Sequence, residues 1–149
     1  MGLLDRLAES SGEPPVGLFV DGPNVFRDEF DVDLDDLRAV GEEEGTLVSA
    51  RLYLDEHATP ALIQAGEAHG YAVVTTSGDV DVRLAVDATA AAVTGEIDVL
   101  IVVSRDTDFK AVLERAASEG VRTVAIAPGK HGRSDALRKT AQRALTLED

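Results

Sequence analysis

The sequence predicts an α/β domain whose mainly parallel sheet of five to six strands is covered by helices on both faces. Two observations predict this class. From residue 16 onward, short apolar segments alternate with helical segments, which is typical of right-handed βαβ units. Several of the strand segments are apolar at every position, as expected when both faces of a sheet are buried. The length of 149 residues fits one domain with a substantial core.

The domain is expected to span residues 16–149, preceded by a separate N-terminal segment at 1–15. Residues 3–8 have the pattern of a short helix, and residues 10–15 read Ser-Ser-Gly-Glu-Pro-Pro, the composition of a linker.

Strands are indicated by runs of β-branched and aliphatic residues that end in turn-forming residues. The first run, 17–20, is apolar throughout, and the run at 98–103 is apolar at every position after Asp98. The expected strands are 17–20, 46–54, 71–75, 98–103 and 122–127, with a further edge strand at 144–147.

Helices are indicated by their capping residues. Asp33 is placed as the N-cap of a helix that Gly45 ends, Thr59 and Pro60 as N-cap and first position of the next, and Gly120 as a terminator. The helix at 80–93 stands out because it is apolar nearly all round. The expected helices are 34–44, 60 to about 70, 80–93, 107–119 and 134–142.

Four aspartates in three separate stretches are the candidate functional residues. Two stretches follow strand-like runs, and the middle one begins an apolar helix. Because ligands of parallel sheets bind beyond the carboxyl ends of the strands, we expect these carboxylates to meet at one edge. Adjacent carboxylates need a cation, which indicates metal-dependent chemistry on phosphates. The stretches are Val20-Asp21-Gly22-Pro23-Asn24, Gly78-Asp79-Val80-Asp81-Val82 and Ser104-Arg105-Asp106-Thr107-Asp108-Phe109.

Each stretch also has a purely structural interpretation. Asp21 fits a turn that caps the next element, and Asp106 fits the N-cap of the following helix. Asp87 is expected on a different face of its helix from Asp81, and it can pair with Arg83 four residues earlier. Asp81, at the N-terminal end of the helix, is therefore the better candidate for the site.

The charge is strongly acidic and unevenly distributed. The formal net charge is −14, and only three of the 14 basic residues are lysines. Such a surface is typical of proteins from concentrated salt, where self-repulsion is screened; we therefore expect a salt-adapted source. The last third, in contrast, contains basic residues that fit a nucleic-acid track as well as a solvated surface. These are Arg105, Lys130, Arg133, Arg138, Lys139 and Arg143.

Few aromatic side chains are present to stack against bases. Phe26 and Tyr53 are the candidates, and core packing is the favoured interpretation for Tyr53. The three histidines show no ligand spacing, and the absence of cysteine excludes disulfides and thiolate metal sites. No apolar run approaches a membrane span and no signal-peptide pattern begins the chain, so a cytoplasmic location without membrane contact is expected.

Together these stretches resemble the NYN domains of the LabA-like branch within the PIN-like nuclease superfamily. The resemblance covers about residues 16–147. The first motif matches Asp21-Gly22-Pro23-Asn24. The second, a Val-Asp-Val-x-Leu-Ala-x-Asp pattern, matches residues 80–87, and the third, Ser-Gly-Asp-x-Asp-Phe, matches residues 104–109.

The resemblance implies a Rossmann-like, PIN-like three-layer α/β/α sandwich and a divalent-metal ribonuclease site. By position, Asp21, Asp81, Asp106 and Asp108 would be the catalytic residues and hold Mg²⁺ or Mn²⁺, with Asn24, Ser104 and Asp87 supporting them. Arg105, Lys130 and Arg133 are the candidates for binding the RNA substrate. The expected reaction is direct hydrolysis of a phosphodiester by metal-activated water.

Two departures from the family pattern leave a second function open. The usual Lys-Gly before the middle motif is Gly78-Asp79, and the usual Gly within the third motif is Arg105. Arg105 either narrows the site or binds a substrate phosphate. The alternative is therefore a non-catalytic RNA-binding or regulatory module that keeps the acidic pocket. A homodimer also remains open.

Other metal phosphohydrolases and nucleotide-binding folds fit less well. The haloacid-dehalogenase type requires a second Asp two residues after the first, where this chain has Pro23, and a response-regulator receiver requires a lysine for which Lys130 is only loosely placed. A dinucleotide-binding domain is disfavoured because no Gly-x-Gly-x-x-Gly follows the first strand.

Overall fold

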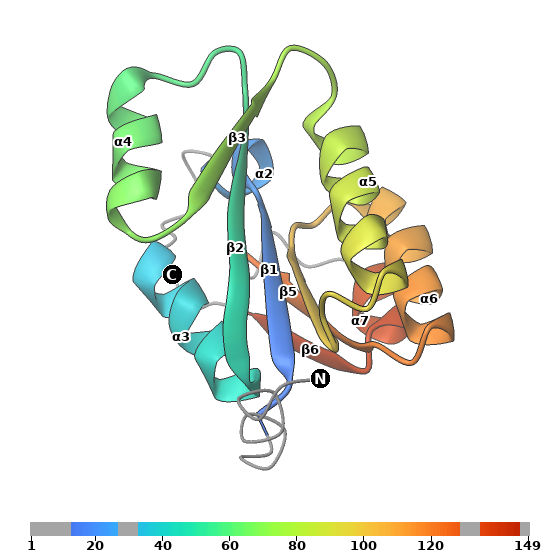
Figure 1. The fold of residues 1–149 in the computed structure, drawn as a ribbon. Helices are drawn as coiled ribbons and strands as arrows, with labels where there is room; N and C mark the ends of the chain where they lie inside the picture. The colour runs from blue at the N-terminus through green and yellow to red at the C-terminus, as the bar shows by residue number, and fades with distance from the viewer. Residues whose placement is uncertain (1–12, 27–32, 129–134, 147–149) are drawn as a thin grey trace.

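The fold is a six-stranded, entirely parallel sheet between two layers of helices (Figure 1). It was obtained as a computed structural model that describes residues 13–26, 33–128 and 135–146. The expected helix at 3–8 and its linker up to residue 12 lie outside these ranges. The strands are β1 Pro15–Asp21, β2 Thr46–Asp55, β3 Ala72–Thr76, β4 Val99–Val103, β5 Arg122–Ala127 and β6 Arg143–Thr146.

Several helices begin or end at the capping residues that the sequence indicates. Asp33 and Thr59 accept N-cap hydrogen bonds from the backbone, and Gly120 ends its helix with a positive φ of 82°. The expected helix at 107–119 begins with a 3₁₀ turn, η1 Thr107–Phe109. The remaining helices are α2 Gly22–Val25, α3 Leu34–Glu44, α4 Pro60–Ala68, α5 Val80–Val93, α6 Lys110–Ser118 and α7 Asp135–Thr140.

The strand order β3-β2-β1-β4-β5-β6 fixes the place of the candidate site. The chain first adds strands on one side of β1 and then, from β4 onward, on the other side. β1 and β4 are therefore neighbours at the point where the direction of winding reverses. In open parallel sheets the crevice beyond the carboxyl ends of such strands is the usual ligand site.

Two hydrophobic layers cover the two faces of the sheet. Phe19 of β1 and Tyr53 of β2 pack with α5, α6 and α7, whereas Leu18 and Val20 of β1 pack with α3 and α4. All five residues of β4 are buried, because this central strand is covered on both faces. The three-layer α/β/α sandwich predicted from the sequence is confirmed.

Helix α5 is apolar nearly all round, as the sequence predicts, but only one face is buried. Leu84 and Ala88 contribute to the core, whereas Val82 and Val86 are largely exposed to solvent. No helix within the described ranges is long and apolar enough to cross a membrane.

A cluster of charged side chains lies at the end of the sheet where the strands begin, opposite the candidate site. Glu44, the buried last residue of α3, accepts a hydrogen bond of 2.6 Å from Arg122 at the start of β5. It also pairs with Arg143 at the start of β6. Arg143 therefore lies at the end of the sheet where the parallel strands begin, away from Asp21 at the end of β1, and its guanidinium pairs with Glu44. Its part in a nucleic-acid track stays a prediction.

Replacing Glu44 is expected to destabilise the fold. In Glu44→Ala, Arg122 and Arg143 lose a shared buried carboxylate, but both guanidinium groups are partly exposed and regain water. We expect a loss of about 1–3 kcal/mol in the free energy of unfolding, measured by denaturant titration. The neighbouring exposed Glu43→Ala serves as control and should leave stability nearly unchanged. Equal effects of the two substitutions would contradict the structural role of Glu44.

Candidate metal centre

The site begins where β1 ends. Asp21 is the last residue of β1, and α2 starts at the next residue. This abrupt turn requires Gly22: a Cβ at this position would lie 2.3 Å from the carbonyl oxygen of Tyr53 and 2.4 Å from Leu54. Pro23 then occupies the first turn of α2, where a missing N–H is tolerated. The carboxyl of Asp21 is thereby held at the end of its strand.

A buried hydrogen bond joins the first motif to the third. The Ser104 hydroxyl donates to Oδ2 of Asp21 at 2.9 Å, and both side chains are at most 2% exposed. The backbone N–H of Asp106 donates to the same Ser104 oxygen at 3.0 Å. Asn24 adds a second link, since its Oδ1 accepts from the backbone N–H of Arg105 at 3.4 Å. Ser104 and Asn24 thus connect the first motif to the third through hydrogen bonds.

Three further carboxylates gather beside this link. Asp81 lies in the first turn of α5, and Asp106 and Asp108 lie at η1. Each offers a carboxylate oxygen, and these oxygens all lie within 4.8 Å of one another. Asp106 also caps η1, because its Oδ1 accepts from the N–H of Asp108 at 2.9 Å. The capping and site interpretations of Asp106 are therefore both compatible with its position.

The surroundings of two aspartates, Asp21 and Asp81, oppose their ionisation. Burial raises the pKa of Asp21 to about 6, the charges of Asp81 and Asp106 act in the same direction, and the hydrogen bond from Ser104 opposes them. Burial, followed by a hydrogen bond with Asp106, also raises the pKa of Asp81. A nearby cation would therefore favour the ionised forms of Asp21 and Asp81.

The donor set fits a hard divalent cation. All three donors in the group are carboxylate oxygens, the ligands that Mg²⁺ and Mn²⁺ prefer. Ligands on opposite sides of Mg²⁺ are about 4.2 Å apart, so oxygens spaced as here can share one ion after small adjustments. Asp21 adds a buried negative charge to the same edge of the sheet.

Comparison with known proteins decides the family. The NYN domain model matches residues 15–148, almost the whole chain. The chain belongs to the NYN domain family. It is 35% identical over 145 residues to an uncharacterized protein of Methanocaldococcus jannaschii, covering 97% of this chain and 60% of that relative. The chain thus spans only about three fifths of the relative's length.

A solved structure supports the fold of this NYN domain. The crystal structure of a protein of unknown function from Vibrio parahaemolyticus superposes with a TM-score of 0.78 at 23% identity. The match covers 92% of this chain and 94% of the other. At this level of identity the similarity establishes the common fold.

Asp87 of the NYN domain lies outside the group of three acids. Its Oδ2 accepts a hydrogen bond from the Tyr53 hydroxyl at 2.8 Å and from Nε of Arg83 at 3.1 Å, and Arg51 lies 3.4 Å away. The pairing with Arg83 confirms one interpretation of the sequence. The contacts from β2 were missed, although Arg51 and Tyr53, two residues apart on a strand, necessarily point to the same face.

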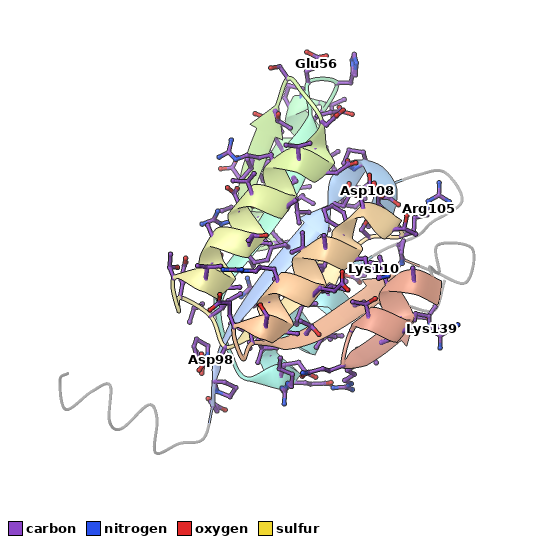
Figure 2. All side chains as sticks on the ribbon, turned by 90° about the vertical axis from the view of Figure 1, so that its right-hand side faces the viewer. Glu56, Asp98, Arg105, Asp108, Lys110 and Lys139 are labelled. Carbon is purple, nitrogen blue, oxygen red and sulfur yellow. The ribbon has the colours of Figure 1, made fainter. Side chains whose placement is uncertain are left out.

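The candidate substrate-binding residues are only partly placed. Arg105 follows Ser104 in the sequence and is half-buried. Figure 2 shows it at the same end of the molecule as Asp108. Lys130 and Arg133 lie outside the described residues. Tyr53 is fully buried, as predicted.

The other aromatic candidate lies at the surface. Phe26 is half-buried and borders a hollow that opens to solvent beside α2. The hollow is lined by Gly22, Pro23, Phe26, Leu54, Asp55, His57, Ala58 and Leu62.

The raised pKa of Asp21 predicts a stability gain on removing its charge. The folded-state pKa of about 6 exceeds the ordinary value of 3.8, so the folded state binds this proton more tightly. Ionisation of Asp21 therefore costs stability progressively as pH rises from about 4 to about 6. Asp21→Asn keeps an oxygen for the Ser104 hydroxyl, and without divalent ions it should stabilise the protein by about 1–3 kcal/mol at pH 7.5.

The same measurement at pH 4 provides the control. There Asp21 is largely protonated in the folded state, so the advantage of Asp21→Asn should shrink toward zero. Denaturant titrations with a chelator present, at both pH values and the same ionic strength, give the comparison. A variant that is less stable than wild type at pH 7.5 would contradict the burial of an ionised Asp21.

Proposed function

We propose that this NYN domain is a divalent-metal-dependent ribonuclease that hydrolyses RNA phosphodiester bonds. The observation that carries the proposal is the meeting of Asp81, Asp106 and Asp108 near buried Asp21, beyond the carboxyl ends of the neighbouring strands β1 and β4. A structural role alone would not require the pKa of Asp21 and of Asp81 to be raised, mainly by burial and further by the charges of neighbouring acids. Family membership supports a nuclease in general terms.

The four aspartates are proposed to hold Mg²⁺ or Mn²⁺. Asp81, Asp106 and Asp108 supply the oxygens that lie closest together, and Asp21 supplies a further negative charge from β1. When bound, such a cation activates water for attack on phosphorus and stabilises the charge that develops on the phosphate and leaving oxygens.

The other residues position this set and the substrate. Ser104 is buried and donates its hydroxyl proton to Asp21, so it serves as a positioning residue and is not placed to act as a nucleophile. Asn24 holds the backbone at Arg105. Arg105 is proposed to bind a phosphate oxygen of the RNA, together with Lys130 and Arg133. Attack by water then breaks one P–O bond and leaves a phosphate monoester and a free hydroxyl, without a covalent intermediate.

The decisive experiment is cleavage of single-stranded RNA with and without Mn²⁺ in molar KCl, the medium that the acidic composition favours. Wild type should require the metal. Asp106→Asn keeps the oxygen that caps η1 but removes the negative charge. It should lower the cleavage rate by about 10- to 100-fold. Asp98→Asn is the matched control because Asp98 is exposed at the opposite end of the molecule from Asp108 (Figure 2). Undiminished cleavage by Asp106→Asn would refute the catalytic site.

A non-catalytic RNA-binding module is the second candidate. It is favoured by Arg105 in place of the family's usual glycine and by Gly78-Asp79 in place of the usual Lys-Gly. RNA binding without turnover under any divalent metal would support it over the ribonuclease.

Both candidate functions give Arg105 the same role toward phosphate. Arg105→Ala should weaken RNA binding and reduce the slope of log K against log salt by about 1, the loss of one phosphate contact. The slope is measured by fluorescence anisotropy over a KCl series, with the exposed Arg115→Ala on α6 as control. An unchanged slope in Arg105→Ala would exclude this contact.

The finer assignment to the LabA-like branch, the cytoplasmic location and the salt-adapted source are part of the same proposal. The branch is supported by the order and spacing of the three motifs, and the salt adaptation by the net charge of −14 with only three lysines. Because the Methanocaldococcus relative is longer than this chain, the activity is proposed for the NYN domain itself.

A further inference from the structure

A hollow lies beside the end of β1, next to the candidate metal centre. Two of its lining residues, Gly22 and Pro23, directly follow Asp21, and another, Asp55, is the last residue of β2. Because β1 and β2 are parallel neighbours, the hollow lies at the same end of the sheet as Asp21. None of the described residues that line it supplies an oxygen to the group of three acids. We call this separate space the α2 hollow.

The α2 hollow offers an aromatic face. Phe26, which directly follows α2, is half-buried and lines the hollow. Every other aromatic side chain within the described ranges is buried in the core: Phe19, Tyr53, Tyr71 and Phe109. Single-stranded RNA is recognised largely by stacking its unpaired bases on aromatic side chains. Within the part of the chain that the structure describes, Phe26 is therefore the aromatic residue that is placed to stack against a base.

The carboxylate at the α2 hollow disfavours a phosphate and favours a ligand that donates hydrogen bonds. Oδ1 of Asp55 accepts the backbone N–H of His57 at 2.9 Å, which orients the carboxylate. Within the described ranges, no donor is bound to Oδ2 of Asp55. An ionised carboxylate is an acceptor only, and its two oxygens can receive two parallel hydrogen bonds. Beside the ring of Phe26, the ligand that fits is thus a flat, uncharged ring with two adjacent donors.

Guanine matches this requirement best among the RNA bases. Its Watson–Crick edge carries N1–H and the N2 amino group side by side, whereas adenine and cytosine present a single amino group there and uracil a single N3–H. We propose that the α2 hollow binds a guanine base of the RNA substrate, stacked on Phe26 and hydrogen-bonded through N1–H and the N2 amino group to Asp55. This inference rests on the proposed action on RNA, and it applies equally to a non-catalytic RNA-binding module.

Binding of free nucleosides tests the α2 hollow without any contribution from phosphate, metal or cleavage. The isotope-labelled full chain is titrated with guanosine, inosine and adenosine in the presence of a chelator, and the amide resonances are followed by NMR. Guanosine should shift the amides of Phe26, Asp55 and Ala58, which line the hollow. Inosine lacks only the N2 amino group and should bind at least about fivefold more weakly, because it loses one hydrogen bond to a charged acceptor. Adenosine, which lacks the paired donors, should bind more weakly still.

Matched substitutions separate the contributions of Asp55 and Phe26 from that of charge alone. Asp55→Asn keeps an oxygen for the N–H of His57 but puts an amide donor in place of Oδ2, and it should abolish the preference for guanosine over inosine. Glu56→Gln removes the same charge at the next residue, which is exposed and does not line the hollow, and it should keep the preference. Phe26→Leu keeps apolar bulk but loses the flat ring, and it should weaken binding of every nucleoside at least about fivefold.

The proposal is overturned if guanosine at its solubility limit leaves the amides around the hollow unshifted, if guanosine and inosine bind equally, or if Asp55→Asn keeps the wild-type preference. These outcomes do not depend on whether the protein is a ribonuclease. Mn²⁺-dependent cleavage of RNA without guanosine binding would refute the base site alone, whereas guanosine binding without cleavage under any divalent metal would refute the ribonuclease and leave the base site in place.

Discussion

The buried contact between Ser104 and Asp21 is the interaction on which the site depends. It lies between the ends of two adjacent central strands, where the winding of the sheet reverses. A carboxylate buried to this degree is stable only when its oxygens have partners, and Ser104 supplies one of them. The same Ser104 oxygen accepts the N–H of Asp106, so the position of the third motif follows from that of the first.

At the carboxyl ends of the strands, binding a cation and folding stably make opposite demands on the aspartates. The burial that raises the pKa of Asp21 and Asp81 disfavours the ionised forms that a cation requires. The opposite edge shows the contrasting solution, since Glu44 there is buried with two arginines as permanent counter-charges. A divalent ion would have the corresponding role at the candidate site, but as a ligand that can be exchanged.

Much of the fold was predictable because its signals are local. Asp33, Thr59 and Gly120 mark helix ends by their own hydrogen-bonding or backbone preferences, and the alternation of strands and helices implies a parallel sheet. The proximity of Asp21 and Asp106, which are joined through Ser104, followed from a general property of strand ends. The contacts of Asp87 with Arg51 and Tyr53 of β2, and that of Arg143 with Glu44, were not predictable, because they depend on which elements become neighbours in the fold and on the end of the sheet at which each strand begins. The exposure of Val82 and Val86 likewise depends on which face of α5 meets the sheet.

The distance along the chain between Asp21 and Ser104 has a consequence for how the protein folds. These residues are 83 positions apart, and β1 must pair with β4 before they can meet. Strands β1, β2 and β3 are synthesised first and can pair with one another while β4 is still missing. Long-range parallel pairing is slow, because the entropy of closing a long loop is lost before contacts compensate for it. We therefore expect the acidic group to assemble late, so that a nascent chain that ends before β4 contains Asp21 and Asp81 without Asp106 and Asp108.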